Sequence, residues 1–316
     1  MSTRPIAIVG AGSIGVAWAL TFARGGRTVR VQDPDAARRD AVAAELNERL
    51  VALDRHGLLD ESVATIAARV TVTAELAVAV ADAEHVQECA PERVDLKREL
   101  FTTLDGLAPA DASLASSSSF LPASQFADEV PGRARCLVAH PGNPPHLLPA
   151  VELVPAPFTD QAVVDRLAAL LESVGMSPVR LKREVDGFVF NRLQGAVLRE
   201  AYCLVRDGVI DVEDLDRVVR DGLGRRWAVV GPFETVDLNT RGGIAAHAER
   251  MGPSYERMGA ERGQHDPWTP ELVDTVDTQR RRQLPLDRWD ERIAWRDERL
   301  LAVAAALAGA GEREDA

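Results

Sequence analysis

The chain has 316 residues, which is enough for one large domain or two ordinary domains with well-buried cores. Its formal net charge of -12 argues against nucleic acid or an anionic membrane surface as the main partner, because phosphate groups would be repelled. No stretch reaches the roughly 18 unbroken apolar residues of a transmembrane helix, and no signal peptide is evident, so we expect a cytoplasmic protein.

The first predicted elements form a strand–helix–strand unit. Residues 5–9 are apolar and are followed by a glycine, which indicates a short buried strand. A G-x-G-x-x-G turn follows over residues 10–15, and residues 16–24 have helix-forming composition. Residues 28–32 alternate and are rich in β-branched side chains, so a second strand should lead to Asp33.

The middle of the chain continues the alternation of helices and strands. Residues 36–69 are helical in character, with a break at residues 56–57. Further strands are predicted over residues 70–73, 84–88, 113–117, 135–139, 151–154 and 177–181, with helices over residues 93–107 and 160–174. Strands that alternate with helices predict a doubly wound sheet.

From Gly187 onward the chain changes character, with few strand candidates and several amphipathic stretches. Helices are predicted over residues 188–207, 212–222, 271–284 and 290–307. We therefore predict an α/β fold, with an N-terminal Rossmann-type doubly wound sheet over residues 1–184 and an all-helical C-terminal domain over residues 185–316.

The glycine turn is typical of dinucleotide-binding domains when it joins a strand to a helix. Gly10 permits a tight turn, Gly12 lets a diphosphate approach the backbone, and Gly15 lets the helix pack closely on the strand. Ser13 and Ile14 open the helix, whose N-terminus would bind the diphosphate.

Asp33 stands where such domains carry an acidic residue. Its carboxylate would accept hydrogen bonds from the adenine ribose hydroxyls and would repel a 2′-phosphate, which predicts NAD rather than NADP. Arg38 and Arg39 stand too far along the next helix to reverse this preference.

Metal chemistry is not expected. The histidines are scattered, and Cys89, Cys136 and Cys203 lie far apart in the sequence. Neither a zinc site nor a disulfide framework follows from such spacing, so the thiols should be free.

A second set of motifs lies downstream of the glycine turn. It comprises a serine run at residues 116–119, H-P-G-N-P-P at residues 140–145, Glu152, and G-F-V-F-N-R at residues 187–192. In this order the motifs resemble the 3-hydroxyacyl-CoA dehydrogenase superfamily, and most of all its λ-crystallin / L-gulonate 3-dehydrogenase branch. The resemblance runs over most of the chain.

The resemblance implies an active site. His140 would be the catalytic general acid/base, and Glu152 the carboxylate that orients and polarises it. Ser119 and Asn191 would hold the reacting oxygen of the substrate, and Asn143 would border both substrate and nicotinamide.

The resemblance also assigns residues outside this centre. Glu92 and Lys97 match positions on the nicotinamide-ribose side of the cleft. Arg226, or its neighbour Arg225, would supply a cation for a substrate carboxylate, from the same subunit or across a dimer interface. The C-terminal helices would bind substrate and form a homodimer, as relatives do.

The chemistry is consistent with these residue types. A secondary alcohol loses its hydroxyl proton as its hydride leaves, and histidine has an ordinary pKa of about 6.5 that suits a proton acceptor. A carboxylate bonded to the far ring nitrogen fixes the tautomer.

Several departures from the acyl-CoA enzymes concern the substrate. Pro141 and Gly142 follow the histidine where bulky apolar residues are usual, and Phe120 follows the serine where a small residue is usual. Gly142 should open space beside Asn143 while Phe120 removes some, so the pocket should be reshaped rather than enlarged. Residues 34–69 contain no lysine to grip CoA. The favoured substrate is a small 3-hydroxy acid of the L-gulonate or carnitine type. The alternatives are a short-chain L-3-hydroxyacyl-CoA dehydrogenase and a crystallin-like protein that binds NAD without turnover.

Overall fold

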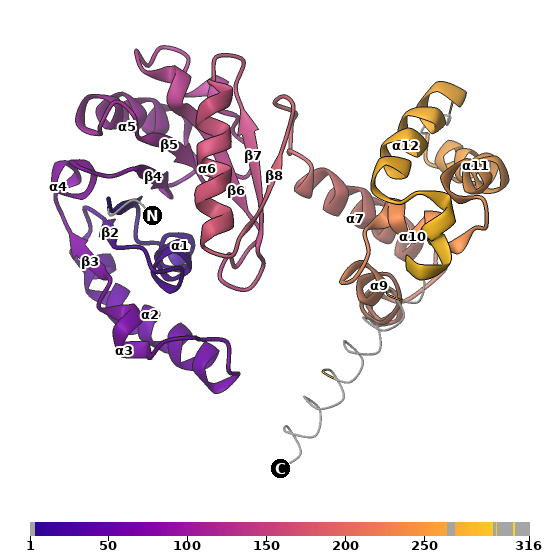
Figure 1. The fold of residues 1–316 in the computed structure, drawn as a ribbon, viewed down its shortest axis with the longest axis horizontal. Helices are drawn as coiled ribbons and strands as arrows, with labels where there is room; N and C mark the ends of the chain where they lie inside the picture. Colours follow the sequence, from indigo (N-terminus) through magenta and orange to yellow (C-terminus); the bar gives the residue numbers. More distant parts are fainter. Residues whose placement is uncertain (1–3, 264–268, 293–294, 296–305, 307–316) are drawn as a thin grey trace. The chain divides into compact units, whose positions relative to one another are not determined.

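The structure is a computed structural model that describes residues 4–263, 269–292, 295 and 306 (Figure 1). The chain divides into two compact units, residues 1–199 and residues 200–316. The division falls inside helix α7 (Phe190–Arg206), beyond the boundary expected from the sequence, because the start of α7 is hydrogen-bonded to the sheet unit.

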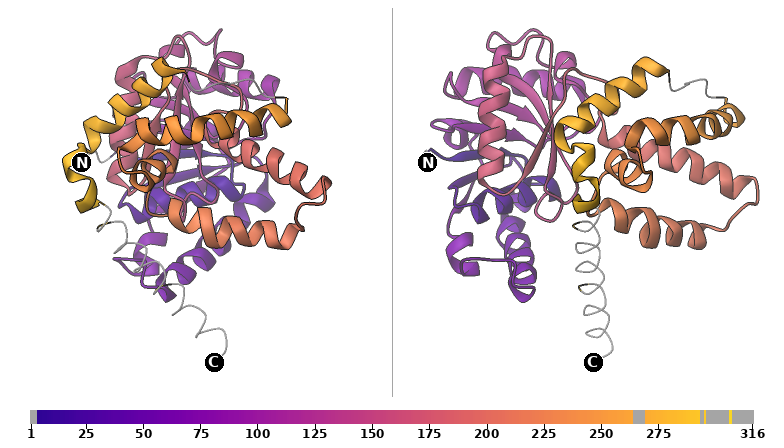
Figure 2. Two further views of the ribbon diagram at one scale, coloured as in Figure 1. Left: turned by 90° about the vertical axis from the view of Figure 1, so that its right-hand side faces the viewer. Right: turned by 45° about the vertical axis from the view of Figure 1, so that its right-hand side comes forward.

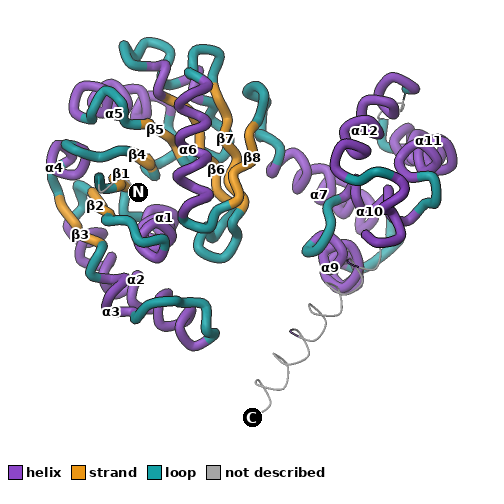
Figure 3. Tube along the Cα trace, in the orientation of Figure 1, coloured by secondary structure: helices purple, strands orange, loops and turns teal. Residues whose placement is uncertain are grey.

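The first unit contains one sheet of eight strands in the order β3-β2-β1-β4-β5-β6-β7-β8 (Figure 3). All neighbouring pairs are parallel except β6 and β7, which are antiparallel. The strands are β1 (Ile6–Val9), β2 (Val29–Gln32), β3 (Val70–Thr73), β4 (His85–Glu88), β5 (Ser113–Ser116), β6 (Cys136–Pro141), β7 (Ala150–Pro155) and β8 (Ser177–Arg180). The predicted doubly wound sheet is confirmed, and its order reverses between β1 and β4, where such sheets bind ligands.

Helices cover both faces of this sheet (Figures 1 and 2). Alternate residues of β1 point to opposite faces, so Ile6 and Ile8 join one core while Ala7 and Val9 join the other. The helices of this unit are α1 (Ser13–Arg24), α2 (Ala36–Arg55), α3 (Val63–Ala67), α4 (Leu76–Val80), α5 (Val94–Leu107) and α6 (Gln161–Ser173), with short 3₁₀ turns at Ala123–Gln125 and Arg133–Arg135.

Two details of these helices bear on the predictions. The expected helical break is present, because α2 ends at Arg55 and Gly57 adopts a positive φ of 66°. Helix α4 lies between β3 and β4, where a helical segment is expected between two predicted strands, although its five residues are too short to show a helical period.

Among its described residues, the second unit contains helices joined by short turns and no strand. Its elements after α7 are α8 (Val212–Val218), a π-helical turn (Val219–Gly224), α9 (Arg225–Trp227), α10 (Pro232–Asn239), α11 (Gly243–Glu261), α12 (Pro270–Gln283) and a 3₁₀ turn (Leu286–Arg288). The predicted all-helical domain is confirmed, whereas most of the helix expected over residues 290–307 lies outside the described residues. No described helix is long and apolar enough to cross a membrane.

Asp237 of α10 organises the interior of the second unit. It is fully buried, accepts a hydrogen bond from the backbone N–H of Ile244 at 3.1 Å, and pairs with Arg281 of α12. One carboxylate therefore connects three helices of this unit.

Candidate active site

The glycine turn between β1 and α1 has the shape that a dinucleotide requires. A Cβ on Gly15 would lie 1.9 Å from the carbonyl oxygen of Gly10, and Gly10 itself has a positive φ of 105°. By contrast, a Cβ on Gly12 would meet no atom within 4 Å. The turn is closed toward the protein and open where a diphosphate would lie against the N-terminus of α1, so these residues fit NAD.

Asp33 follows β2 and is held beside this turn. One carboxylate oxygen accepts the backbone N–H of Ala11 at 2.7 Å, and the other accepts that of Asp35 at 2.9 Å. The side chain is therefore oriented before any cofactor binds, as the prediction of an NAD site requires.

The arginines of α2 lie nearer the turn and Asp33 than their place along the helix suggests, although the predicted preference for NAD stands. Arg38 Nε donates to the carbonyl of Ala11 at 3.1 Å, and Arg39 Nη1 donates to the carbonyl of Asp33 at 2.9 Å. Arg49 donates to the carbonyl and hydroxyl of Ser13 at 3.0 and 3.1 Å. Helix α2 thus turns three cations toward the start of α1 and the end of β2.

His140 and Glu152 face one another across β6 and β7. The antiparallel register pairs the two residues directly, and His140 Nδ1 lies 2.8 Å from Glu152 Oε2. Only 6% of His140 and 5% of Glu152 are exposed, so the carboxylate is shielded from water. Glu152 is not on an exposed edge, because β8 pairs with the other side of β7.

The second carboxylate oxygen of Glu152 accepts hydrogen bonds at the start of α7. Oε1 accepts the backbone N–H groups of Val189 and Phe190 at 2.8 and 3.0 Å. A carboxylate at a helix N-terminus is stabilised by the unpaired N–H groups and by the helix dipole. This anchor could not be inferred from the sequence, although the G-F-V-F motif at residues 187–190 builds it.

Two aromatic rings flank the histidine. The buried ring of Phe188 lies 5.6 Å from the His140 ring between centroids, and Phe190 meets it edge-on at 6.1 Å. Phe188 has a positive φ of 49°, which is rare for a bulky residue and turns the chain into α7. The imidazole is therefore held by packing as well as by its hydrogen bond.

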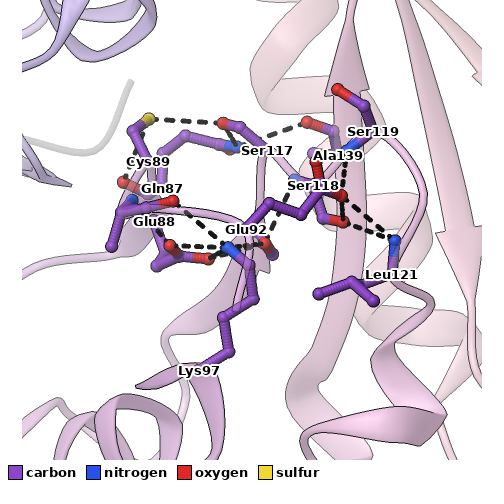
Figure 4. A network of polar contacts seen from close by, with 12 residues as sticks. Gln87, Glu88, Cys89, Glu92, Lys97, Ser117, Ser118, Ser119, Leu121 and Ala139 are labelled. Carbon is purple, nitrogen blue, oxygen red and sulfur yellow. Dashed lines mark hydrogen bonds and ion pairs between the residues drawn. The ribbon is translucent and has the colours of Figure 1, made fainter. Parts of the chain in front are cut away.

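Glu92 clamps the serine loop that follows β5 (Figure 4). Its Oε1 accepts the hydroxyl of Ser118 at 2.6 Å and the backbone N–H groups of Ser119, Phe120 and Leu121 at 3.0, 2.8 and 3.2 Å. Burial alone would raise the pKa of Glu92, but these hydrogen bonds outweigh it and lower that pKa below its ordinary value. The carboxylate stays charged and fixes the loop.

Asn191 meets the same loop from α7. Its Nδ2 donates to the backbone carbonyl of Ser119 at 2.9 Å. The structure therefore brings Ser119 and Asn191 together, through the main chain of one and the side chain of the other. The start of α7 is therefore hydrogen-bonded both to the serine loop, through Asn191, and to Glu152, through the N–H of Phe190.

Lys97 lies beneath the serine loop rather than on a surface (Figure 4). It is 1% exposed, and its Nζ lies 2.7 and 2.8 Å from the two carboxylate oxygens of Glu88. The ammonium also donates to the hydroxyl of Ser116 at 3.2 Å, and that hydroxyl accepts the backbone N–H of Ser118. The contacts of Lys97 support the loop from below, and its partner Glu88 was not singled out from the sequence.

A second buried network runs alongside. The hydroxyl of Ser117 accepts hydrogen bonds from Gln87 Nε2 at 2.7 Å and Trp18 Nε1 at 3.1 Å. Gln87 Oε1 lies 3.0 Å from His85 Nε2, and His85 Nδ1 lies 2.8 Å from the hydroxyl of Ser113. Burial lowers the pKa of His85 to about 4, so this ring is neutral at physiological pH.

Gly142 does not open space beside Asn143. A Cβ at this position would lie 3.0 Å from Cβ of Leu148, so the glycine permits close packing within the loop between β6 and β7. Asn143 is exposed at the start of that loop, and Phe120 is 55% exposed. Leu148 fills the space expected beside Gly142, because the loop between β6 and β7 folds back onto its first residues.

The remaining expected residue lies elsewhere. Arg226 is a half-buried residue of α9 in the second unit, and its neighbour Arg225 lies 3.8 Å from Asp221. Among the residues that the structure describes, no group of His, Cys, Asp or Glu could hold a metal ion.

The sheet order, the glycine cradle and the oriented Asp33 define a dinucleotide-binding domain of the Rossmann type. The family model for the NAD-binding domain of 3-hydroxyacyl-CoA dehydrogenase matches residues 5–185, and the model for its C-terminal domain matches residues 187–284. The chain therefore belongs to the 3-hydroxyacyl-CoA dehydrogenase family.

Comparison with individual relatives indicates a branch within this family. The chain is 38% identical over 303 residues to λ-crystallin of Oryctolagus cuniculus, which covers 95% of both proteins. It is 41% identical over 279 residues to L-carnitine dehydrogenase of Streptomyces griseus subsp. griseus, which covers 85% of this chain and 78% of that enzyme. These likenesses confirm the predicted superfamily and its λ-crystallin-like branch.

A solved structure agrees with this assignment. That of 5-formyl-3-hydroxy-2-methylpyridine 4-carboxylic acid 5-dehydrogenase, an NAD+ dependent dismutase, has a TM-score of 0.72 and 30% identity. It covers 91% of this chain and 98% of that one. The chain is an NAD-dependent oxidoreductase, and its relatives make it a hydroxy-acid dehydrogenase in general terms.

Proposed function

We propose that the chain oxidises the 3-hydroxyl of a small hydroxy acid, of the L-gulonate or carnitine type, to the 3-keto acid. The observation that carries this proposal is the buried His140–Glu152 pair, because a histidine backed by a carboxylate is a competent proton acceptor. Bound NAD supplies the acceptor for the hydride that leaves the carbinol carbon.

The pair acts through its tautomer. Glu152 accepts a hydrogen bond from Nδ1 of His140, so the lone pair of Nε2 is free to take the hydroxyl proton. As that proton moves to Nε2, the carbinol C–H electrons leave as hydride and the C–O bond becomes a carbonyl. Glu152 then stabilises the imidazolium that has formed.

Ser119 and Asn191 hold the reacting oxygen in this proposal. Glu92 fixes the backbone on both sides of the Ser119 hydroxyl, and Asn191 is already bonded to the Ser119 carbonyl. Donors fixed in advance stabilise developing negative charge without a reorganisation cost. Asn143, exposed at the next loop, would border the substrate.

On the cofactor side, Gly12, Ser13 and Ile14 would hold the diphosphate of NAD at the open face of the turn. Glu92 would face the nicotinamide ribose, and Lys97 would act there by supporting the serine loop.

The choice of a free acid over an acyl-CoA has two supports. Residues 34–69 carry no lysine, and one relative is named as an L-carnitine dehydrogenase. Arg226, or Arg225, would supply the cation for the substrate carboxylate. A short-chain L-3-hydroxyacyl-CoA dehydrogenase remains the second candidate because the family models carry that name.

We also propose that the C-terminal helices pair two copies of the chain. Helix α7 buries none of its side chains, although it carries an apolar stripe on which Leu193 is 59% and Tyr202 76% exposed. Exposed apolar surface of this kind marks an interface. In light scattering, the wild type should have twice the chain mass and Tyr202→Arg should be monomeric; a monomeric wild type would refute the interface.

The substrate proposal is tested with a panel of alcohols. L-gulonate, L-carnitine, 3-hydroxybutyrate and 3-hydroxybutyryl-CoA are each offered with NAD, and the reduced nicotinamide is followed by absorbance. Turnover of a free acid, lost in His140→Ala, supports the proposal. Turnover of the thioester alone establishes the second candidate, and NADH binding without any turnover indicates the crystallin-like protein.

A further inference from the structure

Two arginines of α2, Arg38 and Arg39, lie at the ribose end of the glycine turn, where binding of NAD requires no positive charge. Arg38 Nε donates to the Ala11 carbonyl at 3.1 Å, while the N–H of the same Ala11 donates to Asp33 at 2.7 Å. One residue of the turn is therefore bonded to a guanidinium and to the carboxylate. The Arg38 side chain is 38% exposed, and its other contact is Glu45 at 3.1 Å.

Arg39 lies at the corner between β2 and α2. Its Nη1 donates to the carbonyls of Asp33 and Pro34 at 2.9 and 2.7 Å. These bonds hold a second guanidinium beside the backbone of Asp33. Two cations thus flank the residue whose carboxylate would receive the adenine ribose.

The chemistry of the two nicotinamide cofactors differs at this point alone. The 2′-hydroxyl of NAD donates to a carboxylate, whereas the 2′-phosphate of NADP carries about two negative charges at neutral pH and is repelled by one. Guanidinium groups bind phosphates through charge-assisted, often bidentate hydrogen bonds. The flanking arginines would therefore favour the cofactor that the carboxylate rejects.

We propose that Arg38 and Arg39 form a binding site for a 2′-phosphate monoester that only the carboxylate of Asp33 closes. Asp33 is then the single determinant against NADP, and removing its charge converts the site. To bind a phosphate, the two guanidinium groups would give up their hydrogen bonds to backbone carbonyls, and water would then hydrogen-bond to those carbonyls. This inference concerns the cofactor end of the site and is independent of which alcohol is oxidised.

Binding, rather than turnover, tests the proposal. NADH and NADPH are titrated into the wild type, Asp33→Ser and Asp33→Asn, with nicotinamide fluorescence as the signal, and adenosine 2′,5′-bisphosphate is titrated by calorimetry. The asparagine removes the charge and retains one oxygen for the N–H of Ala11, at the loss of the acceptor for the N–H of Asp35, so it serves if the serine variant misfolds. Each charge-assisted hydrogen bond gained should tighten NADPH binding by about tenfold or more, and NADH should bind more weakly.

The arginines are tested in the Asp33→Asn background. Arg38→Met with Arg39→Met should abolish the gain in NADPH and in the bisphosphate. Arg55→Met is the matched control, because Arg55 ends the same helix about 25 Å from Arg38 and should leave the gain intact. A gain that survives loss of both arginines, or a folded Asp33→Asn protein with no gain, overturns the proposal.

Discussion

Replacing Glu152 with glutamine isolates the tautomer of His140 from the packing around it. The two side chains have nearly the same shape, and the amide oxygen of glutamine can accept the N–H groups of Val189 and Phe190 as Oε1 does now. The amide NH₂ then faces Nδ1 of His140, which must become the acceptor. The ring proton moves to Nε2, and the nitrogen that should receive the substrate proton is occupied.

The size of the effect follows from this assignment. General base catalysis contributes about 10²–10⁴ in rate, and loss of the orienting carboxylate in a serine protease, which places the histidine in the wrong tautomer, costs about 10⁴. We expect kcat of Glu152→Gln to fall by about 10³, or about 4 kcal/mol in the barrier. Loss of the charge at the N-terminus of α7 should cost only about 0.3–2 kcal/mol of unfolding free energy.

Three measurements check this reasoning on the same variant. The value of kcat is measured with a substrate of the wild type, the Kd of NADH by fluorescence, and the unfolding free energy in urea. Glu152→Ala is the comparison, because it removes the acceptor of the N–H groups of Val189 and Phe190 and should also unfold more easily. If Glu152→Gln binds NADH normally and keeps kcat within about threefold of the wild type, the proposed role of Glu152 is refuted.

Further predictions concern the cofactor turn and the buried polar groups. Gly15→Ala should reduce both stability and NADH affinity, because its Cβ meets a carbonyl at 1.9 Å, whereas Gly12→Ala should weaken NADH binding with an unchanged urea midpoint; equal loss of stability in both variants would contradict this. Lys97→Met should cost about 3–5 kcal/mol in urea unfolding, because Glu88 is left buried without its partner, and Glu88→Gln in the same chain should recover most of it; additive losses would exclude this coupling. Burial keeps the pKa of His85 at about 4 in the folded protein against about 6.5 unfolded. Its contribution to stability is therefore complete above about pH 6.5 and is lost as the pH falls toward 4, by about 3 kcal/mol in total. His85→Asn should flatten this part of the urea-derived stability profile, and an unchanged slope would show that other groups are responsible.

The cofactor turn could be predicted from sequence because its signals are local. The apolar run of β1, the glycines of the turn and Asp33 after β2 lie within one short stretch, and each constrains the backbone where it stands. The buried strands β1 and β2 were predictable for a similar reason, since buried parallel strands are short apolar or β-branched runs. In such segments the neighbouring residues supply most of the information.

The residues that support the serine loop from below could not be predicted in this way, because only the folded sheet brings them into contact with one another. Glu88 ends β4 and Lys97 belongs to α5, and nothing in their spacing shows that both turn inward beneath the serine loop. The same applies to Ser117, which receives donors from Trp18 and Gln87. Such contacts depend on sheet order and register, which a single sequence leaves open.

Two features that could not be predicted from the sequence also have physical causes. Arg38 lies nearer the turn than its place along α2 suggests, because the first turn of the helix faces Ala11, and this orientation does not show in the sequence. Helix α11 was not predicted because Pro253 interrupts its pattern, although the helix continues through the proline.

In the hairpin of β6 and β7, the paired strands position His140 and Glu152, and the connecting loop does not. The ladder between the strands sets the distance from His140 to Glu152, so the connecting residues 142–149 have no part in holding the pair. A strand register resists slippage because a shift by one residue would turn the side chains of the shifted strand to the opposite face of the sheet. The connecting loop can therefore change in length or composition while the His140–Glu152 pair, the proposed proton acceptor, stays intact. New substrate preferences can arise there, by natural variation or by grafting, without the chemistry being rebuilt.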